Sequence, residues 1–552
     1  MSRWSLLAIL AASISATAQA PNPADPCPLG RAQVALRGLG VQAQLFTNGN
    51  LFFGGTTTNG DGYLVPFNAG TPERNRSPLY AANLWVGGTV DGTARSAGST
   101  FYDFQLRPGA AGPDGTPPTP AACADADRIW IVSRYDVEQY LRTGVATDDL
   151  ADWPVALGAP VLDGDGVAGN YSLADGDQPA LRGDVMAFWA MTDLAYSRDP
   201  VTLPGEGPLG VDVTVEAFAF LTPQPMLAQT TVYRFTVTNR NPVPIDSTRI
   251  GLWLDEDLGN ASDDFIGTDT THALLYTYNA DDDDEGATGY GLDPPAFGMT
   301  VLDSPPGADG RPLGLTATRF YPNGSSPQTT GQPRTSRAIR NALRGRWNDG
   351  TLVRERGDGY NQPVTAPATP YAFPGDPVTG QPWSEVNNGS PAPINAPGNR
   401  FMIGSTGPVQ LAPGASAVFS VALVFGQGTD RFDSITALRR AASTMRRLHD
   451  AGRFEAQPVE GIAVPRVRTL QIRRPAPNPF VGTTRLTLLD LDGLDVRVRV
   501  LDVLGREVQR LDLVPTLRAE PVEIGAGLAP GVYVVRVSGN AFDATVTAVK
   551  SR

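Results

Sequence analysis

Acidic residues are crowded between positions 255 and 285, where their spacing could support cation binding or acid–base chemistry. They fall into three groups: Asp255-Glu256-Asp257, then Asp263-Asp264 with Asp269, then Asp281–Glu285. The first group directly follows an apolar run that ends at Leu254. Carboxylates this close repel one another unless a cation or solvent screens their charge. The stretch is therefore the first candidate site.

Calcium fits this pattern because it takes about six to eight oxygen ligands, which acidic loops between strands supply. Leu258, Phe265 and Ile266 interrupt the first two groups, so we expect part of the loop to be buried. The sequence predicts a calcium site with the ligands Asp255, Asp257, Asp263, Asp264 and Asp269. Two alternatives stay open: a solvated acidic loop and a catalytic carboxylate pair. The run at 281–285 alone is expected to be solvated.

A smaller acidic pattern occurs upstream. Asp163-Gly164-Asp165-Gly166 is followed by Asp175-Gly176-Asp177. Asp next to Gly is typical of tight turns, because the short carboxylate hydrogen-bonds nearby backbone and Gly adopts positive φ. We expect turns here rather than a site.

Other catalytic signatures are absent from the sequence. His272 and His449 are the only histidines, which leaves no multi-histidine metal site. There is no Gly-x-Ser-x-Gly elbow, phosphate-binding loop or Cys-x-x-Cys motif. The sequence names no reaction and favours a non-catalytic protein.

Composition bounds the class of protein. The 552 residues include 60 Gly and 49 Pro, which indicates many turns, while 41% hydrophobic residues supply material for cores. The net charge of −13 argues against nucleic-acid binding, which needs a basic face. Cys27 and Cys123 are the only cysteines. In an oxidising compartment the even count predicts a disulfide between them.

The N-terminus has the features of an export signal. Arg3 precedes a short apolar run, and Ala18-Gln19-Ala20 has the small residues that a signal peptidase requires. We expect a signal peptide at 1–20, with cleavage after Ala20. No later segment is long and apolar enough to span a membrane.

Alternating apolar and polar residues predict the strands that must position the acidic groups. Val211–Phe220, Gln229–Thr238 and Thr248–Leu254 alternate in this way, and Ala417–Phe425 adds a long apolar strand. We expect a central β-sandwich domain at 201–457, with residues 305–399 as a long excursion from its core.

A helix is expected at Ile435–Asp450, because its apolar residues recur at helical spacing. Asp433 or Ser434 is the expected N-cap and Gly452 the expected stop. The arginines on its other faces are expected to be solvated, and lipopolysaccharide binding is the alternative.

The last eighty residues hold an ordered series of motifs. They run from Arg474-Pro-Ala-Pro-Asn-Pro-Phe480, through Val496–Asp502 and Leu504-Gly505-Arg506, to Pro530-Gly531-Val532-Tyr533. Their alternation predicts half-buried strands joined by turns. We expect Leu486, Leu488, Val498, Val500, Val532, Val534 and Val537 to contribute to the core of a seven-stranded β-sandwich.

This series resembles the type A C-terminal sorting domain of cargo proteins of the type IX (Por) secretion system. The resemblance implies an immunoglobulin-like β-sandwich sorting domain at 474–552, after a linker at 458–473. It also implies export through the periplasm to the outer cell surface or the medium, with the secretion machinery as partner. Upstream, four blocks resemble the N-terminal region of large uncharacterised cargo proteins of that system: Gln44–Phe53, Gly60–Pro66, Ala82–Gly88 and Ser99–Phe104.

The sequence therefore predicts an all-β, multi-domain protein with few helices. An N-terminal β-rich domain is expected at 21–200, although one domain across 21–457 stays open. Three functions are compatible: a structural or adhesive surface protein, a carbohydrate-active hydrolase, or a carbohydrate-binding protein. A surface lipopolysaccharide or polysaccharide is the expected kind of partner. Trp85, Trp189 and Trp253 could stack on sugars, although their strand positions favour the core.

Overall fold

The computed structural model describes eleven stretches of the chain: 27–53, 62–71, 74–98, 104–196, 207–323, 328–388, 395–459, 471–489, 496–513, 519–539 and 542–552. The expected signal peptide with Ala20, and most of the expected linker at 458–473, lie outside them. The chain divides into two compact units, residues 1–133 with 152–457 and residues 134–151 with 458–552. The fold is mostly β, with several antiparallel sheets and few helices, which confirms the expected fold class.

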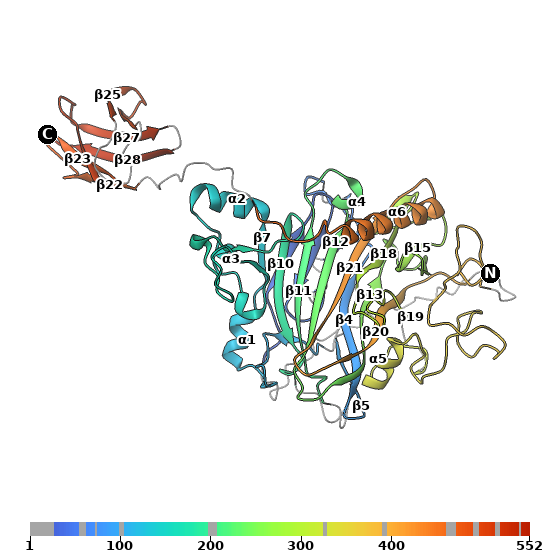
Figure 1. The fold of residues 1–552 in the computed structure, drawn as a ribbon. Helices are drawn as coiled ribbons and strands as arrows, with labels where there is room; N and C mark the ends of the chain where they lie inside the picture. The colour runs from blue at the N-terminus through green and yellow to red at the C-terminus, as the bar shows by residue number, and fades with distance from the viewer. Residues whose placement is uncertain are drawn as a thin grey trace, which may run out of the picture. The chain divides into compact units, whose positions relative to one another are not determined.

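The larger unit is built on a sheet of nine strands (Figure 1). Eight of them follow the order β14 (Asp264–Asp269), β15 (Leu274–Asn279), β18 (Ala296–Asp303), β21 (Ser416–Gly426), β12 (Thr231–Asn239), β11 (Val211–Ala219), β10 (Val185–Thr192) and β6 (Arg107–Pro108). The ninth, β7 (Trp130–Ser133), also pairs with β10.

A second sheet of five strands packs against the first. Its order is β19 (Ala317–Pro322), β20 (Arg400–Leu411), β13 (Ile245–Glu256), β4 (Ala81–Val90) and β5 (Thr93–Gly98). Leu252 and Leu254 of β13 share one core with Val213 and Val215 of β11, so this core lies between the sheets. Both sheets take strands from either side of residue 200, since β4 pairs with β13 and β10 with β11.

Smaller elements surround these sheets. They are the sheet β1 (Gln33–Arg37), β2 (Gln42–Phe46) and β3 (Tyr63–Leu64), the pairs β8 (Val161–Leu162) with β9 (Gln178–Pro179) and β16 (Asp283–Asp284) with β17 (Gly291–Leu292), and the helices α1 (Pro120–Ala126), α4 (Pro225–Ala228), α5 (Ser336–Ala342), η2 (Val155–Leu157) and η3 (Leu173–Asp175). Helices α2 (Arg134–Thr143) and α3 (Asp148–Ala151) belong to the 134–151 segment. Among the described residues, no helix is long and apolar enough to cross a membrane.

Residues 305–399 do not form an excursion away from the core. They contribute the edge strand β19 and helix α5, which packs on β4 and β5. Phe373 and Trp383, from the irregular part of this segment, join the core between the sheets. The high Gly and Pro content of this segment indicated its turns. Its position against the sheets depends instead on these few buried aromatic residues.

Helix α6 (Arg431–Asp450) begins a turn earlier than the sequence indicates. Asp430 is the N-cap, and its carboxylate accepts hydrogen bonds from the backbone N–H groups of Phe432 and Asp433. The expectation of solvated arginines is wrong for Arg439, which pairs with Asp269 and Asp376 at 2.8 Å each. The apolar stripe of α6 packs on β15, β18 and β21.

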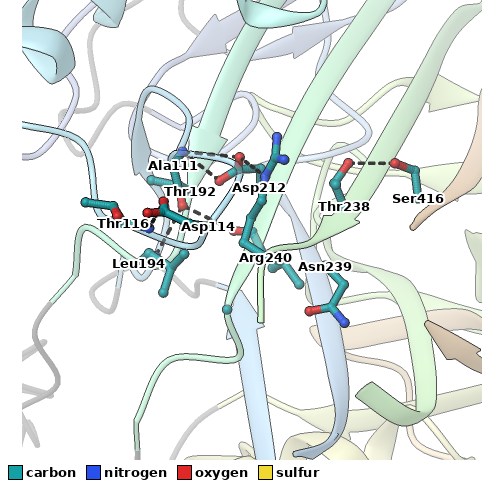
Figure 2. A network of polar contacts seen from close by, with 12 residues as sticks. Ala111, Asp114, Thr116, Thr192, Leu194, Asp212, Thr238, Asn239, Arg240 and Ser416 are labelled. Atoms are coloured by element: carbon teal, nitrogen blue, oxygen red, sulfur yellow. Dashed lines mark hydrogen bonds and ion pairs between the residues drawn. The ribbon is translucent and has the colours of Figure 1, made fainter. Parts of the chain in front are cut away.

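Buried carboxylates in the larger unit are commonly satisfied by backbone or arginine. Figure 2 shows one such network, in which Asp212 of β11 accepts hydrogen bonds from the backbone N–H of Ala111 and pairs with Arg240 at 2.6 Å. Asp193 accepts from the backbone N–H groups of Leu209 and Val211 in the same way. These contacts tie loops to the ends of β10 and β11.

The C-terminal unit contains seven described strands in two sheets. One sheet has the order β22 (Gln471–Ala476), β23 (Thr484–Leu489) and β26 (Ala519–Ile524). The other has the order β25 (Glu507–Leu513), β24 (Val496–Leu501), β27 (Gly531–Gly539) and β28 (Phe542–Lys550). One apolar core takes residues from both sheets.

Five of the seven residues expected in this core are buried: Leu486, Leu488, Val498, Val500 and Val537. The expectation is wrong for Val532 and Val534, which are 46% and 38% exposed. Tyr533 and Val535 face the core instead. Because Val532–Val535 is apolar on both faces, alternation alone does not fix the strand's orientation there.

Cys27 and Cys123 form a disulfide with their Cα atoms 5.9 Å apart. Cys123 lies in α1, and Cys27 precedes β1, so the bond ties the start of the described chain to α1. The backbone N–H groups of Arg31 and Ala32 also donate to Asp127, just after α1. Disulfides persist in oxidising compartments and are rare in the cytosol.

We expect Cys123→Ser to lower the free energy of unfolding by about 2–5 kcal/mol, because the bond closes a long loop in the unfolded chain. Denaturant unfolding of the oxidised protein measures this change. Cys27→Ser should give the same loss, and reductant should destabilise only the wild type. Equal stability of wild type and variant under oxidising conditions would contradict the prediction.

Candidate functional site

The candidate site lies at the C-terminal end of β13, where the acidic group 255–257 begins. Both faces of β13 are buried. Leu252 and Leu254 face the core between the sheets. Trp253 faces the other way, into an aromatic layer where it stacks on Trp85 at 6.3 Å and on Phe401 at 5.4 Å between ring centroids. Successive side chains of a strand alternate between faces, so the acids that follow Leu254 are carried into both environments.

Asp255 and Asp257 line a pocket of about 300 Å³ on the aromatic side of the sheet. Tyr321 of β19 lies beside them and accepts a hydrogen bond at 2.7 Å from Nε1 of Trp253. The complete lining is Tyr80, Trp253, Asp255, Asp257, Tyr321, Pro322, Asn323, Gln332, Asn399 and Phe401. Pro322 and Asn323 are exposed, whereas Trp253, Asp255 and Tyr321 are buried. The pocket therefore has a polar, solvent-facing side and a buried acidic and aromatic floor.

The two aspartates of the pocket differ in their partners. Asn399 donates to Oδ1 of Asp257 through its side-chain amide at 2.7 Å. Oδ1 of Asp255 is buried and has no hydrogen-bond partner among the described residues. The Oδ1 atom of Asn399 is likewise buried without a partner there. The pocket thus presents hydrogen-bond acceptors that the described protein does not satisfy.

Burial governs the protonation of this pair. Burial, with Asp257 and Glu256 nearby, raises the pKa of Asp255 well above its usual range. Burial raises the pKa of Asp257 to about 6, against the favourable hydrogen bond from Asn399. Groups that interact this closely titrate as a pair, so the two share their protons over a broad pH range.

A second set of acids faces the space between the sheets. Glu256 is only 2% exposed, and neither of its carboxylate oxygens has a hydrogen-bond partner among the described residues. Asp264 accepts from the backbone N–H of Leu258 at 3.1 Å, but its Oδ1 is buried without a partner there. Burial is the main reason that the pKa of each is raised well above the usual range.

The basic residue nearest in register to Glu256 is engaged elsewhere. Arg400 lies opposite Glu256 across β13 and β20, yet its guanidinium pairs with Glu385 at 2.8 Å. It also donates to the backbone carbonyl of Asp264. Within the described stretches, no ion pair reaches Asp255, Glu256, Asp257 or Asp264.

The structure does not bring the five expected calcium ligands together. Asp269 lies at the far end of β14 from Asp264, about 16 Å away for an extended strand. It pairs there with Arg439, and His272 Nδ1 lies 3.0 Å from its carboxylate. Asp263 is close to Asp284, which contributes with burial to a raised pKa of about 6 for Asp263. Sequence spacing placed Asp269 wrongly because a whole strand separates it from the other acids.

The run at 281–285 is only partly solvated. Asp284 is buried and accepts hydrogen bonds from the backbone N–H groups of Asn260 and Tyr290. Asp284 thereby fixes the loop after β13, a role that its place in an acidic run concealed.

The upstream aspartates form the closest acidic cluster of the described residues. Carboxylate oxygens of Asp163, Asp165 and Asp177 all lie within 4.8 Å of one another. Each also accepts backbone hydrogen bonds, as Asp177 does from Gly164 and Ser172. The turns expected from the Asp-Gly pattern are present, with Gly166 and Gly176 at positive φ.

The tryptophans considered for sugar stacking belong to the interior. Trp85, Trp189 and Trp253 are all buried, as their strand positions indicated. Trp253 contributes to the floor of the pocket without offering an open ring face.

Comparisons with known proteins add little to this picture. No protein-family model and no curated protein matches the chain. Among solved structures, a polysaccharide lyase is similar at 9% identity and a TM-score of 0.18, over 61% of this chain and 34% of that one. The chain thus spans about a third of the length of that lyase.

We expect Asp257→Asn to stabilise the protein at neutral pH. The folded pKa of about 6 exceeds the ordinary value of 3.8, so the folded state binds this proton more tightly between those pH values. Raising the pH through this window therefore lowers the stability of the wild type. The variant should gain about 1–3 kcal/mol at pH 7 and nothing near pH 3.5.

Denaturant unfolding across pH 3.5–8 measures the difference. The control is Asp376→Asn, which should lose stability at pH 7, because its pairing with Arg439 outweighs burial and lowers the pKa of Asp376 in the folded state. A loss of stability at pH 7 for Asp257→Asn, similar to that of the control, would refute the proposed cost of burying Asp257.

Proposed function

We propose that this chain is an exported binding protein of the bacterial cell surface, carried there by the type IX secretion system. The observation that supports export is the C-terminal unit, in which the motifs of the resemblance have structural roles. Asn478 donates to the backbone carbonyl of Thr547 and accepts from the backbone N–H of Val549. Phe480 is buried against Gly525, where an added Cβ would clash with its ring.

These contacts give the Pro-Asn-Pro-Phe motif a structural role in the C-terminal unit. The backbone of Phe480 also accepts from Ser551 and donates to Val549, so the motif holds the last strand in place. The first and last parts of the C-terminal unit are joined in this way. Such a unit is suited to recognition by the secretion machinery in its folded form. The disulfide between Cys27 and Cys123 is consistent with passage through an oxidising periplasm.

The binding role rests on the pocket at the end of β13. It combines unpartnered acceptor atoms of Asp255 and Asn399 with aromatic walls in a concave site. The larger unit is proposed to bind its ligand without transforming it.

A carbohydrate-active hydrolase is the second candidate. Glycoside hydrolysis requires one protonated carboxyl group as acid and one ionised carboxylate as base or nucleophile. In this reading Asp255, with its pKa raised well above the usual range, would be the acid, and Asp257, with a pKa of about 6, the ionised partner. Carbohydrate binding without catalysis would use the same groups as hydrogen-bond acceptors for sugar hydroxyls.

Deleting residues 475–552 should trap the chain in the periplasm, because the proposed signal is lost. Cell fractionation and surface labelling in a bacterium with the type IX system measure this. Full-length protein with Asp257→Asn is the control and should reach the surface, since the substitution lies outside the C-terminal unit. Normal surface display of the truncation would rule out the proposed route.

Screening the purified full chain against a polysaccharide panel should detect no released product. Reducing-end and ultraviolet assays report hydrolysis and elimination, while calorimetry reports binding. Turnover that disappears in both Asp255→Asn and Asp257→Asn would establish the hydrolase instead.

A further inference from the structure

The pocket at the end of β13 combines negative charge with unmet hydrogen-bonding capacity. Asp255 is 3% exposed and its Oδ1 has no partner among the described residues. Asp257 lines the same pocket, and Glu256 lies between them on the opposite face of the strand. Burying a carboxylate without a partner is costly, so such a group is either protonated or paired with a cation.

Among the described residues, no ion pair reaches the acids of this pocket. Arg400 is engaged by Glu385, as described above. Arg319 of β19 is buried near the pocket and forms no ion pair there with a described residue. It stacks 3.5 Å over the ring of Trp347 and donates to the backbone carbonyls of Arg346 and Thr330, while its Nη1 is buried without a partner among the described residues. Lysine occurs once in the whole sequence, at Lys550, whose ammonium donates to the backbone carbonyl of Gly525. Asp255 therefore has no counter-charge among the described residues.

The shape and lining of the pocket decide which kind of cation fits. A bare divalent metal needs several oxygen ligands in one coordination sphere. Among the described residues, only Asp163, Asp165 and Asp177 bring three carboxylate oxygens within 4.8 Å of one another, and they lie elsewhere. The pocket of about 300 Å³ is also far larger than an ion, and aromatic residues form much of its wall.

Aromatic walls beside carboxylates are the chemistry that recognises organic ammonium groups. Rings attract a cation through their negative faces, and carboxylates and amide oxygens accept its N–H groups. Tyr80 and Tyr321 supply the rings, while Phe401 packs between Trp253 and Tyr321 behind them. Asp255, Asp257 and Asn399 supply the acceptors.

We propose that this pocket binds the ammonium group of a small organic amine, with Asp255 and Asp257 as its counter-charges. This inference rests on the binding role proposed above, but not on the route of export. It names the ligand class of the pocket as cationic rather than as a neutral sugar.

Ligand binding should be linked to proton release. The amine favours the ionised carboxylates, whereas burial favours the protonated forms. The titratable groups around the pocket are Asp255, Asp257, Glu256, Tyr80 and Tyr321. Burial lowers the pKa of the nearby Arg319 to about 9, so it stays charged at neutral pH. Affinity for an amine should therefore fall as the pH drops below about 6, where the pKa of Asp257 lies.

Calorimetric titration of the purified full chain with 1,5-diaminopentane tests the proposal. The matched neutral probe is 1,5-pentanediol, which has the same length and hydrogen-bonding ends without charge. We expect saturable binding of the diamine at pH 7.5, at least tenfold tighter than the diol at matched ionic strength. Asp255→Asn and Asp257→Asn should each weaken diamine binding at least tenfold.

Asp163→Asn is the control, because it removes a carboxylate from the other acidic cluster and should leave diamine affinity unchanged. Melting curves identify any variant that does not fold. If Asp255→Asn or Asp257→Asn fails to fold, the test uses the other of the two. Equal binding of diamine and diol, equal weakening by Asp163→Asn, or displacement of the diamine by stoichiometric calcium would each overturn the proposal. Binding of a neutral glycan in this pocket without diamine binding would overturn this inference alone and leave the binding role intact. Failure of the amine and of every polysaccharide to bind would remove both.

Discussion

Burial of both faces of β13 is the constraint on which the larger unit depends. Its Leu252 and Leu254 join the core between the sheets, and Trp253 anchors the aromatic layer on the other side. The last side chains of a strand in this position are buried unless the chain leaves the sheet before them. Here Asp255 and Glu256 still belong to the strand, so their charges lie in a low-dielectric environment on both sides of the sheet.

Other buried acids of the same unit show how such charges are normally accommodated. Glu216 pairs with Arg182 at 2.9 Å, and Glu385 pairs with Arg400. Asp212 combines an arginine with backbone N–H donors, so its carboxylate has a partner on each side. Asp255 and Glu256 lack such partners among the described residues. This contrast, rather than acidity alone, is the reason for choosing the end of β13 as the candidate site.

The sequence predicted elements where one period dominated. Strict alternation of residue types located β11 and β12, and the apolar stripe located α6. The alternation did not show that both faces of β11 are buried, since Asp212 and Glu216 on its polar face are paired with arginines. It failed where both faces are apolar, as at Val532–Val535, since no polar residue marks the outside. It also failed where partners come from distant segments. Asp269 and Asp376 meet Arg439 only in the folded chain, and neither charge pattern nor spacing indicates this.

The crowding of acidic residues in the sequence pointed to the candidate site, but the sequence did not predict which residues surround it. Acid crowding drew attention to Asp255 and Asp257, while the pocket needs Tyr321 and Asn399 from a segment whose sequence reads as loop. A cationic ligand that pairs with these acids would also reduce the repulsion between them. Part of its binding free energy would therefore come from removing an unfavourable electrostatic energy of the empty protein. Such a site trades stability of the empty state for affinity. The same carboxylates that weaken the free protein at neutral pH are therefore the groups through which a cationic ligand would stabilise it.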